Sequence, residues 1–583
     1  MERGHWRRKP GQVVYTHDAR CRDCYRCLRA CPIKAIRVVD GQAYVDSDRC
    51  IACGTCIREC PQKAKAFRND IEKAQRLIGS GAPVAASVAP SFAALLDADG
   101  RGRLPAALRR MGFTFVAETA VGAFEVARRT AEIAAKHPGG TLICTACPAV
   151  TAYIEQYEPD LAPLLAPLVS PMIAHARRIK KRLGPGARVI FLGPCVTKKA
   201  EAERPELAGD VDCVLTFAEM ADWMDTRGVS LADCPVEPFD EEPGGDARFF
   251  PLPGGLTRTA GLGADALDPG VVAVSGVDEL RQALDNARAS GAPMLLEPLF
   301  CAQGCVNGAG MPERGNLFGR RGGVLEFART HPGAADARPP EGGAALLAAE
   351  YRVRSAADGD FPEERIREVL EKTGKGGDAD QLNCGACGYA SCRDQAVAVL
   401  NGMATPEMCI PHMRRLAEQR GDKIIETTPN GVVILDGELN LLAMNPAFRA
   451  MFQCGDAVLG KRVSLLMDAD PFERVLSGAA ERFEATVRHE RYRVVCHQII
   501  YLMPDVRQVV GVFVDITNTV ESEETLERLR AETARKAQEL LDHQVQMAQE
   551  MARFLGQSTA QSEELVANMM RLARARRERP EEG

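Results

Sequence analysis

Hydrophobic positions change their spacing along the chain, and each change predicts a different kind of element. Between about residues 71 and 344, short runs rich in β-branched residues alternate with longer stretches that are apolar at helical spacing. Strands are predicted over 83–88, 141–144, 188–192 and 270–274, and helices over 124–136 and 171–183. This alternation is typical of an α/β domain with parallel strands.

The C-terminal third begins with a different pattern. A zone rich in alanine, glycine and charge, residues 341–359, predicts a linker, and a helix is predicted over 362–373. From Pro429 the sequence predicts a strand, a turn at Asp436 and Gly437, a second strand and a helix that begins near Asn445. A small α+β domain is therefore expected here.

Beyond residue 520 the pattern becomes helical, with side chains repeating every seven residues. One row is Leu526, Thr533, Leu540, Met547 and Phe554, and a second row follows one residue later. The repeat predicts a coiled coil and hence a homodimer. Gly556 and Ser558 are expected to end it before a second helix over 563–572. The alternative is a helical hairpin that packs on the preceding domain.

Length and charge limit the classes of function. A chain of 583 residues predicts four or five domains, and its net charge of -6 argues against a nucleic-acid partner. The longest apolar run, residues 82–96, is interrupted by prolines and too short to span a bilayer. The basic N-terminus, residues 1–11, leads into no apolar segment. We therefore expect a cytoplasmic protein with no membrane partner.

Cysteine spacing adds the first chemistry. The chain has 21 cysteines, which in a reducing compartment are more often metal ligands than disulfides. Eight of them form the run C-x2-C-x2-C-x3-C-P twice, which predicts two [4Fe-4S] clusters. Because the fourth cysteine of each run ligates the other cluster, the predicted ligand sets are Cys21, Cys24, Cys27 and Cys60, and Cys50, Cys53, Cys56 and Cys31. Zinc is disfavoured, since its spacing would not require the third cysteine of each run.

A further set has the spacing C-x2-C-x4-C and is closed by a fourth cysteine seventeen residues later. Its members are Cys384, Cys387, Cys392 and Cys409. The set resembles the small single-cluster [4Fe-4S] domain that is attached to several redox proteins. Gly385 and Gly388 favour a loop folded tightly round a cube. The alternative is that the four cysteines bind a zinc ion.

Four more cysteines lie in three short loops scattered over the α/β region. They are Cys147 in TACPAV, Cys195 in GPCVTKKAE, and Cys301 and Cys305 in EPLFCAQGCVNGAG. Thiolates that arrive from different sides are what a large, deeply held iron-sulfur cofactor requires. The loops of Cys147 and Cys195 directly follow predicted strands, where open α/β sheets hold their ligands.

The three loops resemble the signature segments of [FeFe]-hydrogenases. The resemblance implies an H-cluster, a [4Fe-4S] cube linked through one cysteine to a two-iron unit that carries CO and cyanide. The matching ligands are Cys147, Cys195, Cys301 and Cys305, with Cys305 as the bridge. Lys198 matches the lysine that donates a hydrogen bond to a cyanide, and Glu201 matches the glutamate that closes the same segment.

Departures from the family pattern indicate its sensory branch. Catalytic members carry a proton-relaying cysteine directly before the first ligand, but this chain has Ala146, which predicts slow turnover with the cofactor still bound. Gly193 stands where a methionine is usual, and Val150 where a tryptophan is usual. The third segment ends in residues 308–311, GAGM, in place of a glycine run with glutamine.

The segment from residue 421 to 518 resembles a PAS sensory domain, for which no cofactor is predicted. The predicted domains are a two-cluster ferredoxin domain (1–75), an α/β H-cluster domain (76–345), a helical single-cluster domain (360–418), a PAS domain (419–519) and a coiled coil (520–575). The fold class is thus multidomain, α/β and α+β. His543 lacks the pattern of a phospho-accepting histidine box.

The resulting hypothesis is a sensory [FeFe]-hydrogenase-like protein that binds and slowly oxidises H2. It would pass the redox state through its clusters to the PAS domain and coiled coil, with a ferredoxin or similar redox partner and a separate kinase or phosphatase. Two alternatives stay open. One is a catalytic hydrogenase of low turnover, and the other is an iron-sulfur electron-transfer or assembly protein without the two-iron unit.

Overall fold

A computed structural model describes residues 9, 11–136, 139–263, 270–290, 293–313, 315–334, 343–354 and 359–575. The residues outside this description include most of the basic N-terminal stretch, parts of the expected linker over 341–359, and residues 576–583. The chain divides into two compact units, residues 1–413 and 414–583. No described helix has both the length and the apolarity needed to cross a bilayer.

The N-terminal part of the first unit is built from two similar halves. Strand β1 (Val14–Thr16) pairs antiparallel with β4 (Lys65–Phe67), and β2 (Ile36–Val39) pairs with β3 (Gln42–Val45). Helices α1 (Arg26–Ala30) and α2 (Thr55–Glu59) each carry the third cysteine of a run and end at the fourth. The repeat in the sequence is therefore a repeat in the fold.

The middle of the first unit contains two parallel sheets. One has the order β6-β5-β8-β9, formed by Phe115–Glu118, Val84–Val88, Arg188–Gly193 and Cys213–Thr216. The other has the order β10-β11-β7, formed by Val271–Ser275, Met294–Leu299 and Thr141–Ile143. The four predicted strands are confirmed, and the predicted alternation of strands and helices is divided between two sheets.

Helices cover these sheets because their apolar faces match the buried strands. Helix α5 (Ala120–Lys136) packs against α7 (Pro171–Leu183), and further helices are α4 (Ala98–Arg110), α9 (Phe217–Thr226), α11 (Val277–Ser290) and α12 (Leu317–Thr330). The core around the four-stranded sheet includes Phe92, Val116, Ile190 and Phe217, each at most 1% exposed. This core fixes the ends of the strands, where the cysteine loops begin.

The last part of the first unit is small and helical. Helices α14 (Glu363–Lys372) and α15 (Cys392–Leu400) pack together through a separate apolar cluster. The amide N–H of Val38 donates to the carbonyl of Met403 at 3.0 Å, so this part lies against the strand β2. Helix α16 (Ile410–Thr427) begins next and continues into the second unit.

The second unit contains a five-stranded antiparallel sheet in the order β13-β12-β16-β15-β14. The strands are Leu441–Met444, Gly431–Leu435, Gln508–Asp515, Val494–Met503 and Arg482–His489. Helices α17 (Pro446–Met451) and α18 (Asp470–Leu476) pack on it. The predicted strand, turn, strand and helix are thus confirmed. Across two strands, His497 Nε2 lies 3.0 Å from Glu484 Oε1.

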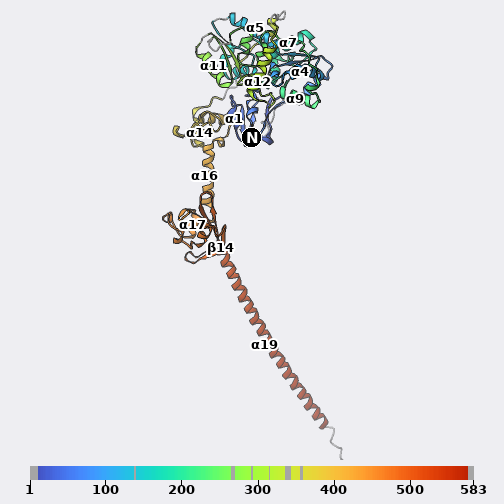
Figure 1. The fold of residues 1–583 in the computed structure, drawn as a ribbon. Coiled ribbons are helices and arrows are strands. Elements are labelled where there is room, and N and C mark those ends of the chain that lie inside the picture. Colours follow the sequence, from blue (N-terminus) through green and yellow to red (C-terminus); the bar gives the residue numbers. More distant parts are fainter. Residues whose placement is uncertain are drawn as a thin grey trace, which may run out of the picture. The chain divides into compact units, whose positions relative to one another are not determined.

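The last described element is one helix, α19 (Thr517–Ala575), of 59 residues (Figure 1). The prediction that Gly556 and Ser558 end a first helix is wrong, because the helix runs through both residues. A single helical glycine costs only about 1 kcal/mol relative to alanine, which the flanking helix formers Leu555 and Gln557 help to offset. The helical-hairpin alternative is excluded by the same continuity.

Candidate metal centre

The two cysteine runs near the N-terminus exchange their fourth members. Burial raises the pKa of Cys27, Lys65 opposes this shift, and the nearby thiols of Cys21, Cys60 and Cys24 add to it. In the second group, burial and the thiol of Cys53 raise the pKa of Cys31 to about 11. The fold therefore brings together the two sets that the spacing predicts, Cys21, Cys24, Cys27 and Cys60, and Cys50, Cys53, Cys56 and Cys31.

Backbone amides in both halves point at the sulfur atoms. The N–H of Ala35 donates to Cys31 Sγ at 3.3 Å, and the N–H of Ala64 donates to Cys60 Sγ at 3.2 Å. Ala52 does the same to Cys50 Sγ at 3.3 Å. Such hydrogen bonds stabilise thiolate charge and tune the potentials of iron-sulfur clusters, so these donors fit a pair of cubes.

The cysteines of the single-cluster set, Cys384, Cys387, Cys392 and Cys409, lie around the start of α15. Burial raises the pKa of Cys387, and the thiols of Cys409 and Cys384 contribute to the shift. Cys392 is the first residue of α15, and its N–H donates to Asn383 Oδ1 at 2.8 Å. Gly385 and Gly388 have φ of 68° and 95°, the left-handed conformation that the tight loop needs.

This set lies beside the two-cluster domain. A Cβ on Gly388 would lie 3.1 Å from Leu28 Cγ of helix α1, so the loop contacts the helix that carries Cys27.

Within the described part of the chain, no three histidine, cysteine, aspartate or glutamate side chains are placed to hold one metal ion. The thiols around a cube lie farther apart than those around a single zinc ion.

The three remaining cysteine loops meet at the carboxyl ends of parallel strands. Cys147 follows β7 and precedes α6 (Pro148–Tyr157), Cys195 lies between β8 and α8 (Thr197–Ala202), and Cys301 follows β11. All four cysteines, Cys147, Cys195, Cys301 and Cys305, line one cavity of about 80 Å³. Burial raises the pKa of Cys195 to about 11 and that of Cys301 to about 12, and neighbouring thiols add to both shifts.

A second cavity of about 80 Å³ lies next to the first. Cys305 and Cys195 line both cavities, whereas Cys147 and Cys301 line only the first. Ser91 contributes to the wall of the second cavity, and its buried hydroxyl has no hydrogen-bond partner among the described residues. The site thus offers four thiolates for a cube, a second space of similar size beyond Cys305, and a buried hydroxyl without a partner on a residue of its wall. These features fit a cube joined through Cys305 to a second unit.

Lys198 is buried and lines both cavities. Its ammonium donates to Ser170 Oγ at 2.7 Å and to Glu201 Oε2 at 2.8 Å. A lysine ammonium has three N–H donors, so one is left for a group in the cavity. Glu201, which the sequence also singles out, therefore orients Lys198 and balances its charge.

Close backbone contacts hold the third loop in place. The N–H of Cys305 donates to the carbonyl of Pro251, and the N–H of Gly310 donates to the carbonyl of Pro194, both at 2.8 Å. A Cβ on Gly308 would lie 2.3 Å from the same Pro194 oxygen. The glycines are needed for this approach, which joins the loop of Cys305 to the loop of Cys195.

Two positions that depart from the family pattern lie in or near the walls. Ala146 lines both cavities, so the methyl group stands where a relaying thiol would be. Val150, in α6, is fully buried. Ser91, by contrast, was missed from the sequence, because a serine in a short apolar segment carries no spacing signal.

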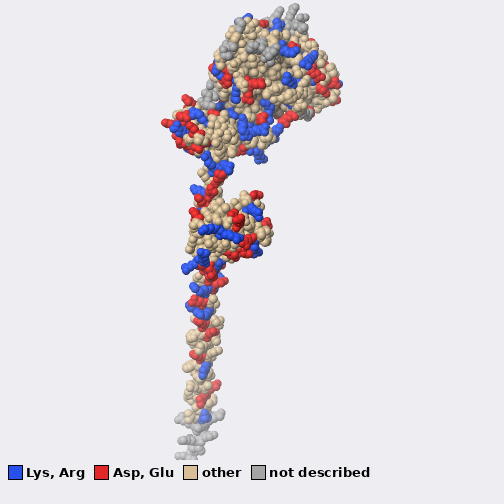
Figure 2. Space-filling view, turned by 60° about the vertical axis from the view of Figure 1, so that its left-hand side comes forward, with Lys and Arg blue, Asp and Glu red and all other residues tan. Residues whose placement is uncertain are grey.

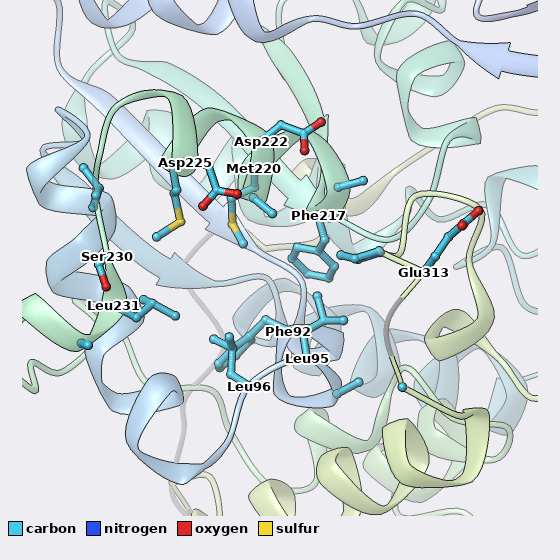
Figure 3. Close-up of a pocket in the computed structure, with 18 of the residues that line it drawn as sticks. Phe92, Leu95, Leu96, Phe217, Met220, Asp222, Asp225, Ser230, Leu231 and Glu313 are labelled. Atoms are coloured by element: carbon cyan, nitrogen blue, oxygen red, sulfur yellow. The ribbon is translucent and has the colours of Figure 1, made fainter. Parts of the chain in front are cut away.

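A larger cavity, of about 930 Å³, is lined by none of the site's cysteines and by neither Lys198 nor Ser91. Phe92, Phe217 and Met220 form its apolar wall, and Asp225 and Glu313 add carboxylates (Figure 3). No cysteine is among the described residues that line it. The short helix η2 (Pro90–Ala94) separates the two kinds of space, because Ser91 lines the cavity at Cys305 and Phe92 lines the larger one.

Comparison with known families agrees with the arrangement of the cysteines. Residues 82–309 match the family of the iron only hydrogenase large subunit, C-terminal domain. Residues 13–72 match a 4Fe-4S dicluster domain, residues 380–411 match a putative Fe-S cluster domain, and residues 422–487 match a PAS domain.

Individual relatives are more distant. The NADP-reducing hydrogenase subunit HndD of Solidesulfovibrio fructosivorans is 26% identical over 36% of this chain and 45% of its own. The cytosolic Fe-S cluster assembly factor NAR1 of Eremothecium gossypii is 26% identical over 30% of this chain and 52% of its own. The chain spans about half the length of the curated relatives it matches. A solved structure of the [FeFe]-hydrogenase HydA1 from Chlamydomonas reinhardtii, in a variant form, is 19% identical over 50% of this chain and 100% of its own, with a TM-score of 0.40.

Proposed function

Because the chain is an [FeFe]-hydrogenase-like iron-sulfur protein with a PAS domain, we propose that it is a sensor of H2. In this role it binds and slowly oxidises H2 at an H-cluster, and its redox state biases the PAS domain and the helix α19. The observation that carries the proposal is the pair of adjoining cavities that share Cys305.

The residues of the site have separate tasks. Cys147, Cys195, Cys301 and Cys305 would hold the cube, and Cys305 would also hold the two-iron unit. When bound, the H-cluster supplies the metal chemistry that splits H2 heterolytically. Lys198 and Ser91 provide hydrogen-bond donors inside the second cavity, where a low dielectric strengthens each hydrogen bond.

The ferredoxin-type cysteine sets lie where [4Fe-4S] clusters would carry electrons away from the site. Cys53 lines the cavity of the four thiols, so one ligand of the ferredoxin-type cubes forms part of its wall. Thr197 Oγ1 donates to the carbonyl of Ala52 at 3.1 Å, and a Cβ on Gly54 would lie 2.3 Å from that of Ala309. These contacts support a path from Cys305 through both cubes to the single cluster near Leu28, with a ferredoxin or similar redox partner.

The output passes to a separate polypeptide. The PAS domain is followed by α19, whose exposed apolar side chains include Leu540 and Phe554, at 63% and 72% exposure. A second copy of the chain covers these side chains in a coiled coil, and the resulting homodimer presents the PAS domain to a kinase or phosphatase. In this proposal the redox state of the clusters shifts the PAS domain between two packing arrangements, and this change is passed on to α19.

Two other functions make different predictions. A catalytic hydrogenase of low turnover would use the same site, with Ala146 as the limiting defect. A cluster assembly or electron-transfer protein, in line with the similarity to NAR1, would hold cubes alone. The orphaned hydroxyl of Ser91 in the second cavity favours a site that accepts a group beyond the cube.

The test compares the full-length protein matured with and without the two-iron unit. Electron paramagnetic resonance of the cubes is recorded anaerobically under argon and under H2. The proposal predicts that H2 reduces the cubes only in the fully matured protein, and slowly. No reduction by H2 in a protein whose two-iron unit is loaded would contradict the proposal, whereas a protein that takes up cubes but no two-iron unit would favour the cluster-only alternative.

A further inference from the structure

A line of buried polar side chains starts in the wall of the second cavity. Thr119 follows strand β6 and lines this cavity together with Cys305 and Ala146. Its hydroxyl lies 2.7 Å from the hydroxyl of Ser87, on the neighbouring strand β5. Both side chains are buried, at 4% and 0% exposure. A proton donor or acceptor in the cavity therefore has a hydroxyl pair beside it.

The next group in the line is His175, on helix α7. Its Nδ1 lies 2.8 Å from Ser87 Oγ, and its ring is fully buried. Among the described residues its Nε2 has no partner at hydrogen-bond distance, and Glu241 Oε2 lies 3.8 Å away. With Nδ1 accepting from Ser87, the neutral ring carries its proton on Nε2, the atom that faces Glu241.

Glu241 connects the line to the surface. Its carboxylate pairs with Arg178 at 3.3 Å and with Arg182, whose side chain is 50% exposed. Burial works against ionisation of Glu241, but His175 and the two arginines outweigh it and lower the pKa of the carboxyl to about 2. The carboxylate therefore carries a negative charge at neutral pH, and it accepts protons only transiently.

The packing of α5 on α7 fixes the position of His175. A Cβ on Gly122 would lie 2.7 Å from the backbone N of His175 and 2.6 Å from the carbonyl O of Pro171, so the helices approach closely at this point. Arg178 also pairs with Glu125 of α5. The neighbouring carboxylate of Glu118 is held on both oxygens by Arg248, which leaves it outside the line.

We infer that Thr119, Ser87, His175 and Glu241 form a proton-transfer path between the cavity at Cys305 and solvent, in place of the cysteine relay that Ala146 removes. The inference rests on the proposed function, in which splitting of H2 releases a proton in this cavity. A proton enters at the Thr119 hydroxyl, the Thr119 proton passes to Ser87, and the Ser87 proton passes to His175 Nδ1. The Nε2 proton then passes to Glu241 and to water.

Each transfer breaks one O–H or N–H bond and forms another, so the path consumes no co-reactant. The return of His175 to its starting tautomer requires its buried ring to turn, and the gap of 3.8 Å to Glu241 must close. Both steps predict a slow path. The ring's Nε2 is fully buried and has no partner at hydrogen-bond distance among the described residues, so its N–H is available for transfer to Glu241.

The test uses the full-length, matured protein and its Ser87→Ala and His175→Gln variants. The matched control is Thr130→Val, which removes a buried hydroxyl on α5 that donates to the carbonyl of Val126 within its own helix. The infrared bands of iron-bound CO and cyanide are recorded under argon, and their rate of change is followed after H2 is added. The spectrum under argon reports whether the site is intact, independently of turnover.

We expect unchanged spectra under argon in all variants, and a rate of band change about tenfold lower in both path variants than in the wild type or the control. Ser87→Ala should lower the rate much less when Ala146→Cys is already present, because the thiol bypasses the path; a merely structural role of Ser87 would leave the same tenfold difference between Ala146→Cys and the double variant. Rates equal to wild type in both path variants would overturn the inference and leave the proposed function intact. Wild-type bands that ignore H2 would overturn both.

Discussion

The ring of Phe191 occupies the space that a side chain at position 193 would need. A Cβ on Gly193 would lie 2.4 Å from Phe191 Cε1 and 2.5 Å from Cζ. Phe191 is 3% exposed and forms part of the wall of the cavity at Cys305. The glycine that departs from the family's methionine is thus compensated by a phenylalanine two residues earlier.

This relationship predicts coupled substitutions. Gly193→Met alone should destabilise the protein by about 1–3 kcal/mol, because the new side chain overpacks a buried site. Gly193→Met combined with Phe191→Ala should recover most of this loss. The measurement is the free energy of unfolding of the first unit, from chemical denaturation. Gly186→Ala is the control, since a Cβ there meets nothing within 4 Å. Equal losses in the single and double variants would contradict the compensation.

Ala146→Cys should increase H2 turnover. The thiol would stand in the walls of both cavities, where it can exchange protons with a group near Cys305. Positioned acid-base groups contribute about 10²–10⁴-fold, so a rise of at least about tenfold in H2 oxidation with an artificial acceptor is expected. Ala146→Ser, with a far less acidic group, is the control. If the cysteine variant turns over no faster than wild type, loss of the relay is not the limiting defect.

Helix α19 should form a parallel dimer. Its apolar side chains are exposed in the single chain, while acidic and basic side chains are interspersed along the rest of its surface (Figure 2). Phe554→Asp should therefore shift full-length protein from dimer to monomer in analytical ultracentrifugation. Gln549→Asp, on the opposite side of the helix, should leave the dimer unchanged. Equal effects of both substitutions would contradict the predicted seam.

The set of Cys384, Cys387, Cys392 and Cys409 should bind iron rather than zinc. Changing Cys384 and Cys387 together to serine should remove one cube, about a quarter of the cubane iron, with no loss of zinc. Metal analysis of the anaerobically purified protein measures both elements. The control changes Cys454, an unassigned cysteine of the PAS domain, to serine, which should leave the iron content unchanged. Loss of zinc in the double variant would instead support a zinc ion bound by these four cysteines.

The sequence predicted the ligands better than their surroundings. Cys60 could be assigned to Cys21 because the repeated run has a fixed geometry, and the strands before Cys147 and Cys195 were visible as apolar runs. Ser91 and His175 could not be found in this way, because their roles depend on contacts between elements that are distant in the chain. Contacts between distant elements produce no pattern in the spacing of residues along the chain.

The error at the C-terminus has a similar origin. Gly556 has a low helix propensity, but propensity is a weak local preference that the rest of a long helix overrides. The division of the α/β strands into two sheets was also not visible, since strands of both sheets have the same apolar pattern. The cavities at Cys305 lie where loops from the two sheets meet, so this division determines the site.

The proposed function depends on Cys305 joining a cube to a two-iron unit that responds to H2. Its most direct test is the infrared spectrum of the anaerobically matured, full-length protein, in the region of iron-bound CO and cyanide, before and after H2 is added. We expect bands that shift reversibly with H2 and that are absent in the Cys305→Ala variant. No bands, after a maturation that loads a control hydrogenase, would contradict it.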